Sequence, residues 1–338
     1  MQAKLSARIC PIWCALLLSS LLVALSEMAL WAQATPCLKR TVEANVVGYA
    51  GGTRPAFMAS NFRGQFRNKP VKILSADLDT KPRRIVLLLD ASGSMVGPSE
   101  EGKWKIALNV ARDAAEKLPP QHSLALIVFA EKLVQSVGSE QSRQAILQQL
   151  SQIEPGEKAL PKGSRRTALW DALQEGLNVL GSPQRGDVLY AITDGGDNAS
   201  STRPKEVERA LLGAGVRLFA FLPLLPQGPP TPEETEGPNT LLSLANHTGG
   251  ILLADPVSPP PLQISLVPRR EPLSPKELRT ALDSLYVAMT SFYRLDIELP
   301  QPVDKMRTWK LELANLPSNT KEHPELAYPR ELLPCSAP

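Results

Sequence analysis

The apolar run Ile85–Leu89 ends at three oxygen-bearing side chains, those of Asp90, Ser92 and Ser94. An apolar run without polar alternation is typical of a strand that is buried on both faces of a parallel sheet. If the backbone stays extended past this strand, alternate side chains project to the same side, so the three side chains converge. Oxygen ligands suit Mg²⁺, Mn²⁺ or Ca²⁺, whereas Zn²⁺ prefers nitrogen and sulfur. The pattern therefore predicts a divalent cation, Mg²⁺ first, at the end of a buried strand.

Strand and helix signals alternate through the middle of the chain. Apolar runs predict strands over residues 85–89, 123–130, 188–193, 216–222 and 251–254. Segments between them predict helices over residues 104–118, 142–153, 167–180, 206–212 and 241–246, with an exposed loop over 223–238. This alternation favours an α/β fold with a doubly wound, mostly parallel sheet, in which ligands bind beyond the carboxyl ends of the strands. Asp90 and Asp194 both follow predicted strands, so we expect them at the same edge of the sheet.

Three separate segments together resemble a known metal site. They are Asp90-x-Ser92-x-Ser94, Thr167 and Asp194, and they occur in the order in which the von Willebrand factor A family carries its metal-ion-dependent adhesion site. The resemblance covers about residues 83–256 and implies that family's fold. It implies that Asp90, Ser92 and Ser94 bind the metal directly or through water. It also implies that Thr167 is a direct ligand in one state and that Asp194 acts through water.

The small negative charge of this ligand set indicates a binding function. One or two carboxylates with hydroxyls leave a divalent ion incompletely neutralised, so a further carboxylate from outside the protein would be attracted. We expect a protein or peptide partner that offers an Asp or Glu side chain. Arg165 and Arg166 stand where the family often has two glycines. They either add attraction for an acidic ligand or narrow access to the site.

Enzyme motifs are missing from the sequence. None of the three histidines, His122, His247 and His323, lies in a nucleophile motif, and no phosphate loop or dinucleotide fingerprint is present. The formal net charge of +3 is too small to indicate nucleic acid as a partner. We expect a protein that is not an enzyme and has no small-molecule substrate. Two alternatives stay open: a structural envelope protein whose metal stabilises the fold, and a metal-dependent hydrolase.

The amino terminus has the form of a targeting segment. Lys4 and Arg8 precede an apolar stretch over residues 9–25, and Ala32-Gln33-Ala34 fits a cleavage signal. The protein is therefore predicted to be exported, either secreted or to the periplasm or cell envelope, with an uncleaved membrane anchor as the alternative. Cys37 and Cys335 bracket the mature chain, and export makes them candidates for one disulfide, the alternatives being free thiols or pairing with another chain.

Composition shifts divide the chain into five parts. We predict a signal peptide over residues 1–34, an accessory β segment over 35–80, the metal-binding domain over 81–256, a proline-rich linker over 257–272, and a helix plus β segment over 273–338. The two flanks are expected to build one small accessory β-rich region from both chain ends. The segments around Asn61-Phe62-Arg63 and Trp309 also resemble exported bacterial, acidobacterial-type proteins with this domain.

Overall fold

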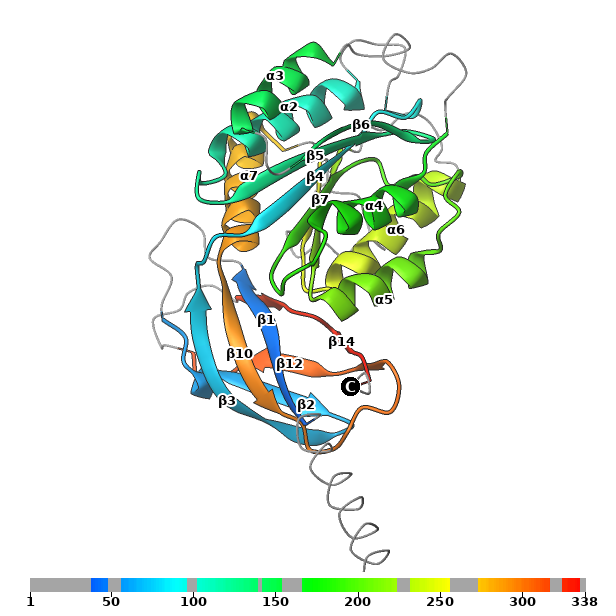
Figure 1. Ribbon diagram of the computed structural model, residues 1–338. Coiled ribbons are helices and arrows are strands. Elements are labelled where there is room, and N and C mark those ends of the chain that lie inside the picture. The colour runs from blue at the N-terminus through cyan, green and yellow to red at the C-terminus, as the bar shows by residue number, and fades with distance from the viewer. Residues whose placement is uncertain are drawn as a thin grey trace, which may run out of the picture.

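The computed structural model describes residues 38–47, 56–95, 102–138, 142–153, 166–223, 232–255, 273–316 and 324–334. The described chain forms two lobes (Figure 1). The α/β lobe comprises described residues between 84 and 290, and the β lobe comprises those of 38–79 and 292–334. The predicted signal peptide, Cys37 and Cys335 lie outside the described residues.

A mostly parallel sheet forms the centre of the α/β lobe. Its strands lie in the order β6 (Leu133–Val137), β5 (Ser123–Phe129), β4 (Arg84–Asp90), β7 (Val188–Ile192), β8 (Arg217–Pro223) and β9 (Leu252–Asp255). Only β6 is antiparallel to its neighbour. The predicted α/β fold is confirmed. The apolar runs are explained by burial on both faces of the sheet.

Helices cover both faces of this sheet, as Figure 1 shows. Helices α2 (Lys103–Lys117), α3 (Arg143–Gln152) and α7 (Pro275–Thr290) pack on one face, and α4 (Leu169–Leu180), α5 (Pro204–Ala214) and α6 (Pro232–His247) pack on the other. Alternate residues of β4 pack into the hydrophobic cores on the two faces of the sheet. Leu87 and Leu89 pack on the side of α2, and Val86 and Leu88 pack on the side of α4. The strand is thus anchored from both sides immediately before Asp90.

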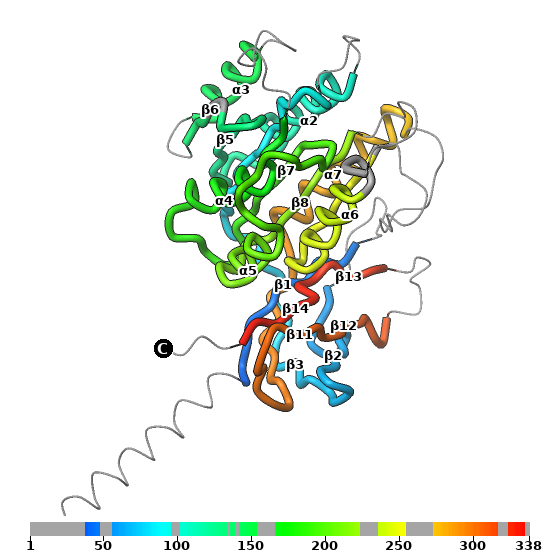
Figure 2. The backbone as a smooth tube through the Cα atoms, turned by 90° about the vertical axis from the view of Figure 1, so that its right-hand side faces the viewer, coloured from blue at the N-terminus to red at the C-terminus, as the bar shows by residue number. Residues whose placement is uncertain are grey.

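The β lobe combines the two ends of the described chain, in agreement with the predicted accessory region. Its antiparallel sheet has the strand order β12 (Lys310–Leu313), β2 (Phe62–Phe66), β3 (Lys69–Asp79), β10 (Phe292–Glu298), β1 (Lys39–Val47) and β13 (Glu325–Ala327). A short helix, η1 (Ala59–Asn61), precedes β2, and strands β11 (Arg307–Thr308) and β14 (Glu331–Leu332) pair with each other. In Figure 2, β13 and β14 lie where the two lobes meet.

Two sequence expectations differ from the structure. The predicted C-terminal segment 273–338 is divided between the lobes, because Leu282, Leu285 and Met289 of α7 pack into the core of the α/β lobe. The predicted loop over 223–238 is wrong for its last part, since helix α6 begins at Pro232 and includes Pro238. Proline inside a helix removes one hydrogen bond and its ring clashes with the carbonyl of the preceding turn, and here the close contact of Pro238 with Gly195 accompanies this exception.

A buried arginine joins the two lobes. Arg217 is 1% exposed, and its guanidinium donates hydrogen bonds to the carbonyls of Ala288 (3.1 Å) and Met289 (2.8 Å) in the last turn of α7. The same group lies 4.2 Å from the ring centroid of Phe292 in the β lobe. Burial lowers the pKa of Arg217 to about 9, with the carboxylate of Glu43 opposing that shift, so the guanidinium is charged at neutral pH.

Candidate metal centre

The predicted ligands lie at the point where the strand order of the sheet reverses. Strand β4 is flanked by β5 on one side and by β7 on the other, with Asp90 paired to Phe129 and Leu89 paired to Ile192. The chain leaves β4 toward α2 on one face, and the loop after β7 leads to α5 on the opposite face. Loops that diverge in this way leave a crevice beyond the carboxyl ends of the strands.

Asp90 is completely enclosed, as is Ser92. Its side chain is 0% exposed, its Oδ1 accepts the Ser92 backbone N–H at 2.9 Å, and its Oδ2 accepts the Thr193 hydroxyl at 2.6 Å. Thr193 Oγ1 in turn accepts the backbone N–H of Gly195 at 3.0 Å. Thr193 therefore connects the loop after β4 with the loop after β7, and both oxygens of the Asp90 carboxylate are held in place by hydrogen bonds.

The two serine hydroxyls lie close together, as expected, but a turn brings them together and not the extended backbone that the sequence interpretation assumed. Ser92 Oγ and Ser94 Oγ lie 3.2 Å apart, and the backbone N–H of Met95 donates to the carbonyl of Ser92 at 3.1 Å to close the turn. Ser92 is buried, whereas Ser94 is exposed. The site is therefore open to solvent on the side of Ser94 and closed on the side of Asp90.

Asp194 has a cationic partner that the sequence interpretation did not foresee. Lys103, in the first turn of α2, places its Nζ 2.9 Å from Asp194 Oδ2. Both side chains are almost fully buried, Lys103 at 8% and Asp194 at 3% exposure. The other Asp194 oxygen, Oδ1, accepts the Gly196 backbone N–H at 3.3 Å. Lys103 thus supplies a fixed positive charge beside the predicted metal ligands.

Thr167 lies on a third loop that is bonded to the Asp194 loop. Its carbonyl accepts the backbone N–H groups of Asn198 (3.0 Å) and Ala199 (2.9 Å), and its own N–H donates to Asn198 Oδ1 at 2.9 Å. Asp197 Oδ1 accepts the N–H of Leu169 at 2.8 Å, which fixes the start of α4. The structure therefore holds Thr167, a buried side chain, beside the loop that follows β7.

The arginine that precedes Thr167 is directed to the loops and not to the buried carboxylates. Arg166 Nη2 donates to the carbonyl of Asn198, and Nη1 lies 3.8 Å from Glu131 Oε1. Its side chain is 58% exposed. Arg165 lies outside the described residues.

Close packing fixes the Asp194 loop from the side of α6. Gly195 has a φ of +86°, and a Cβ at this position would lie 2.9 Å from the backbone nitrogen of Pro238. A larger residue would therefore be strained by its backbone and would also collide with α6. Pro238, which the sequence interpretation placed in an exposed loop, supports the candidate site.

The electrostatics of the site favour a bound cation. Burial raises the pKa of Asp90 to about 7, and the nearby Asp194 carboxylate adds to the shift, while hydrogen bonds from Thr193 and Ser92 oppose it. Two buried carboxylates with one ammonium leave one negative charge in an apolar surrounding. The donor set is made of carboxylate and hydroxyl oxygens, and it fits a hard divalent ion such as Mg²⁺.

Removing the positive charge of Lys103 should strengthen cation binding. Lys103→Met keeps an unbranched side chain that is one atom shorter and leaves both carboxylates without an internal cation. We therefore expect the affinity for Mg²⁺ to rise about tenfold, or about 1.4 kcal/mol. Isothermal calorimetry measures this change. Lys105→Met is the matched control, because Lys105 is exposed on the same helix. An unchanged or weaker affinity in Lys103→Met contradicts the assigned role.

Comparison with known proteins agrees with this geometry. Residues 85–196 match the von Willebrand factor type A domain family. A search of curated proteins found no match.

Several solved structures are similar to the chain. The conserved hypothetical protein BatB from Bacteroides thetaiotaomicron shares 18% identity with a TM-score of 0.44, over 61% of this chain and 98% of that one. Proximal thread matrix protein 1 from the mussel byssus, with a zinc-occupied MIDAS motif, shares 17% identity with a TM-score of 0.44, over 66% of this chain and 49% of that one. A von Willebrand factor type A protein from Catenulispora acidiphila shares 12% identity with a TM-score of 0.43, over 86% of this chain and 74% of that one.

Through the family match of residues 85–196, the chain contains a von Willebrand factor type A domain.

Proposed function

We propose that this protein binds a protein or peptide ligand through a divalent cation held by five side chains, those of Asp90, Ser92, Ser94, Thr167 and Asp194. Mg²⁺ is the proposed ion, with Mn²⁺ or Ca²⁺ as alternatives. The observation that carries the proposal is a pair of buried carboxylates, those of Asp90 and Asp194, beside the exposed hydroxyl of Ser94. When bound, the cation supplies a position that accepts a further carboxylate.

The charge balance supports an acidic ligand. Asp90, Asp194 and Lys103 together carry one negative charge when both carboxyls are ionised, so a divalent ion changes the site to one net positive charge. Ser94 marks the solvent-facing side, where a carboxylate of a partner can approach. An Asp or Glu side chain on a protein surface or in a peptide is therefore the proposed recognition element.

Catalysis is not part of the proposal. Of the described histidines, His122 precedes β5 and His247 precedes β9, so both lie at the amino edge of the sheet, opposite the candidate site. His122 Nδ1 also accepts a hydrogen bond from the backbone N–H of Arg83 at 2.9 Å, so this ring nitrogen is already used in a structural contact. These positions support binding without turnover over a hydrolase.

Export is proposed together with this function. The basic and then apolar sequence before residue 34 supports a cleaved signal peptide, and an uncleaved anchor is the alternative. No helix among the described ranges is long and apolar enough to cross a bilayer. Arg40 Nη1 donates to the carbonyl of Leu333 at 2.7 Å, which supports the predicted Cys37–Cys335 disulfide by bringing neighbouring residues together. That bond stays a prediction.

Peptide selection tests the proposed ligand class. A displayed random-peptide library is captured on immobilised protein in Mg²⁺ and eluted with chelator, and we expect the eluted sequences to be enriched in Asp and Glu. Ser94→Ala, which removes an exposed hydroxyl, should lose this enrichment, whereas Ser243→Ala on the exposed side of α6 should keep it.

Two outcomes would reject the mechanism. One is that peptides captured at the Ser94 side of the site stay bound when chelator is added. The other is that the peptides eluted by chelator are not enriched in acidic residues. If Asp90 variants fail to fold even with Mg²⁺ present, the structural role of the metal is favoured over ligand binding.

A further inference from the structure

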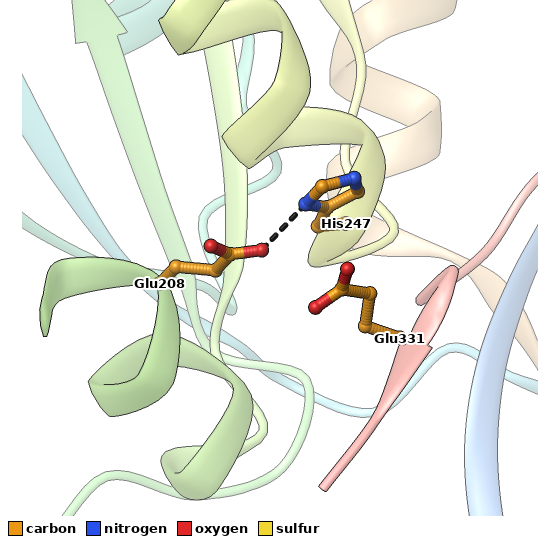
Figure 3. A group of neighbouring side chains, drawn as sticks. All are labelled: Glu208, His247 and Glu331. Carbon is orange, nitrogen blue, oxygen red and sulfur yellow. Dashed lines mark hydrogen bonds and ion pairs between the residues drawn. The ribbon is translucent and has the colours of Figure 1, made fainter. Parts of the chain in front are cut away.

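A second group of possible metal ligands lies where the two lobes meet, as Figure 3 shows. Glu208 comes from α5, His247 is the last residue of α6, and Glu331 is the first residue of β14. One ligand atom from each residue lies within 4.8 Å of the other two. We call this group, Glu208, His247 and Glu331, the junction cluster. It is built from elements of both lobes.

One member of this cluster, Glu208, is buried to a degree that is unusual for a charged side chain, while His247 and Glu331 are partly exposed. Glu208 is 1% exposed, and its Oε1 lies 2.5 Å from His247 Nδ1. Its Oε2 lies 2.8 Å from Lys205 Nζ, but the Lys205 side chain is 66% exposed. A carboxylate that is removed from water requires close partners, and here one of them is a solvated lysine.

Glu331 gives the second, independent observation. Its Oε2 is shielded from solvent and has no hydrogen-bond partner within the described part of the chain. Figure 3 shows its carboxylate turned toward His247 and Glu208 across a short gap. A buried carboxylate oxygen without a partner normally indicates a missing ion or water.

The surroundings leave space for a further ligand. A cavity of about 250 Å³ borders the cluster on the side of Glu208 and His247 and is also lined by Lys205, with Thr240 and Ser243 on its wall. A water molecule in this cavity can complete the coordination of an ion that has three protein ligands. The cluster thus has three donors close together, and there is room for a water ligand beside Glu208 and His247.

We propose that Glu208, His247 and Glu331 bind a Zn²⁺ ion that ties strand β14 to helices α5 and α6. One imidazole nitrogen with two carboxylates is a donor set that Zn²⁺ accepts, whereas Mg²⁺ and Ca²⁺ favour oxygen alone. This site lies at the amino edge of the sheet, because α6 ends there before β9 begins. It is therefore separate from the Asp90 site at the carboxyl edge, and it does not depend on the proposed function.

The ion would complete a set of contacts that already hold the C-terminal segment in place. Trp309 Nε1 donates to the carbonyl of Pro329 at 2.6 Å. A Cβ built on Gly249 would lie 2.6 Å from Pro329 Cδ, so this segment packs closely on the α/β lobe. An ion that binds only the folded arrangement stabilises the junction by mass action.

Calorimetric titration of the full chain with Zn²⁺ tests this proposal. We expect Glu331→Gln and His247→Gln each to weaken one Zn²⁺-binding step at least tenfold. Glu325→Gln, the same substitution at an exposed residue of β13, should leave that step unchanged. The titrations are repeated in the Asp90→Ala background, where the same step should persist. The melting temperature should rise with Zn²⁺ in the parent and less in Glu331→Gln.

The result that overturns the proposal is equal Zn²⁺ affinity in the parent, Glu331→Gln and His247→Gln. A parent chain that binds no Zn²⁺ overturns it as well. Glu331→Gln preserves the shape of the side chain and removes no hydrogen bond of Oε2, so circular dichroism should show an intact fold in this variant.

Discussion

Replacing Asp90 by alanine should abolish site-specific binding of Mg²⁺ or Mn²⁺ in calorimetry. The substitution removes one of two buried carboxylates and also the acceptor that fixes Ser92 and Thr193. Asp90→Asn separates these effects, because the amide keeps the size and one acceptor but loses the charge. We expect Asp90→Asn to lower the affinity at least about hundredfold. Asp77→Asn, at an exposed residue of β3, is the matched control.

The folding of these variants decides what a lost affinity means. Because burial and Asp194 raise the pKa of Asp90, the contribution of this carboxyl to the stability of the metal-free fold is largest below its ordinary pKa of about 4 and is lost as the pH rises through about 7. Asp90→Asn carries no such charge, so its metal-free form should be at least as stable as the parent at pH 8. Unchanged Mg²⁺ affinity in Asp90→Asn contradicts the site assignment.

Replacing Arg217 by methionine should destabilise the protein by about 3–5 kcal/mol, since it removes one partner from a buried charged network. The variant loses two hydrogen bonds to the end of α7 and leaves the Glu43 carboxyl, 2% exposed, with less compensation. Urea denaturation followed by circular dichroism measures the change. Arg209→Met is the control, because Arg209 is exposed on α5.

The size of the Arg217 effect tests how the lobes are joined. If Arg217→Met costs less than about 1 kcal/mol, the guanidinium is not a main link between α7, β8 and the β lobe. We expect the whole urea-unfolding transition to shift to lower urea concentration, because Arg217 contacts both Met289 of the α/β lobe and Phe292 of the β lobe.

Local sequence patterns predicted where Asp90 and Asp194 lie in the fold. The run Ile85–Leu89 is buried on both faces, as its unbroken series of apolar residues predicts. Asp90 and Asp194 follow neighbouring parallel strands, so their shared edge follows from the strand–helix alternation alone. The convergence of Ser92 and Ser94 was predicted for an extended backbone, but it is produced by a turn that begins at Ser92, directly after strand β4 ends at Asp90.

Residues whose roles depend on distant contacts could not be predicted in the same way. Lys103 has the sequence context of an ordinary solvated lysine in a first helical turn, and only the packing of α2 brings it to Asp194. The apolar face of α7 predicts a buried helix but does not say against which sheet. Pro238 indicated a loop because proline is unfavourable inside helices, and the contact with Gly195 lies outside any local pattern.

Short elements at the end of the chain also carried little signal. Strand β14 spans only Glu331–Leu332, too short to show alternation, so the approach of Glu331 to His247 was not visible in the sequence. His247 likewise lies in no recognisable sequence motif. Its partners come from α5 and β14, which are far from it in sequence.

Anomalous scattering from crystals grown with Mn²⁺ tests the central claim most directly. We expect a strong anomalous peak beyond the end of β4, within bonding distance of the Ser92 and Ser94 hydroxyls and close to Asp90, Thr167 and Asp194. Crystals of Asp90→Ala grown in the same way should lack this peak. A well-occupied Mn²⁺ peak elsewhere, with no density among these five side chains, would contradict the account.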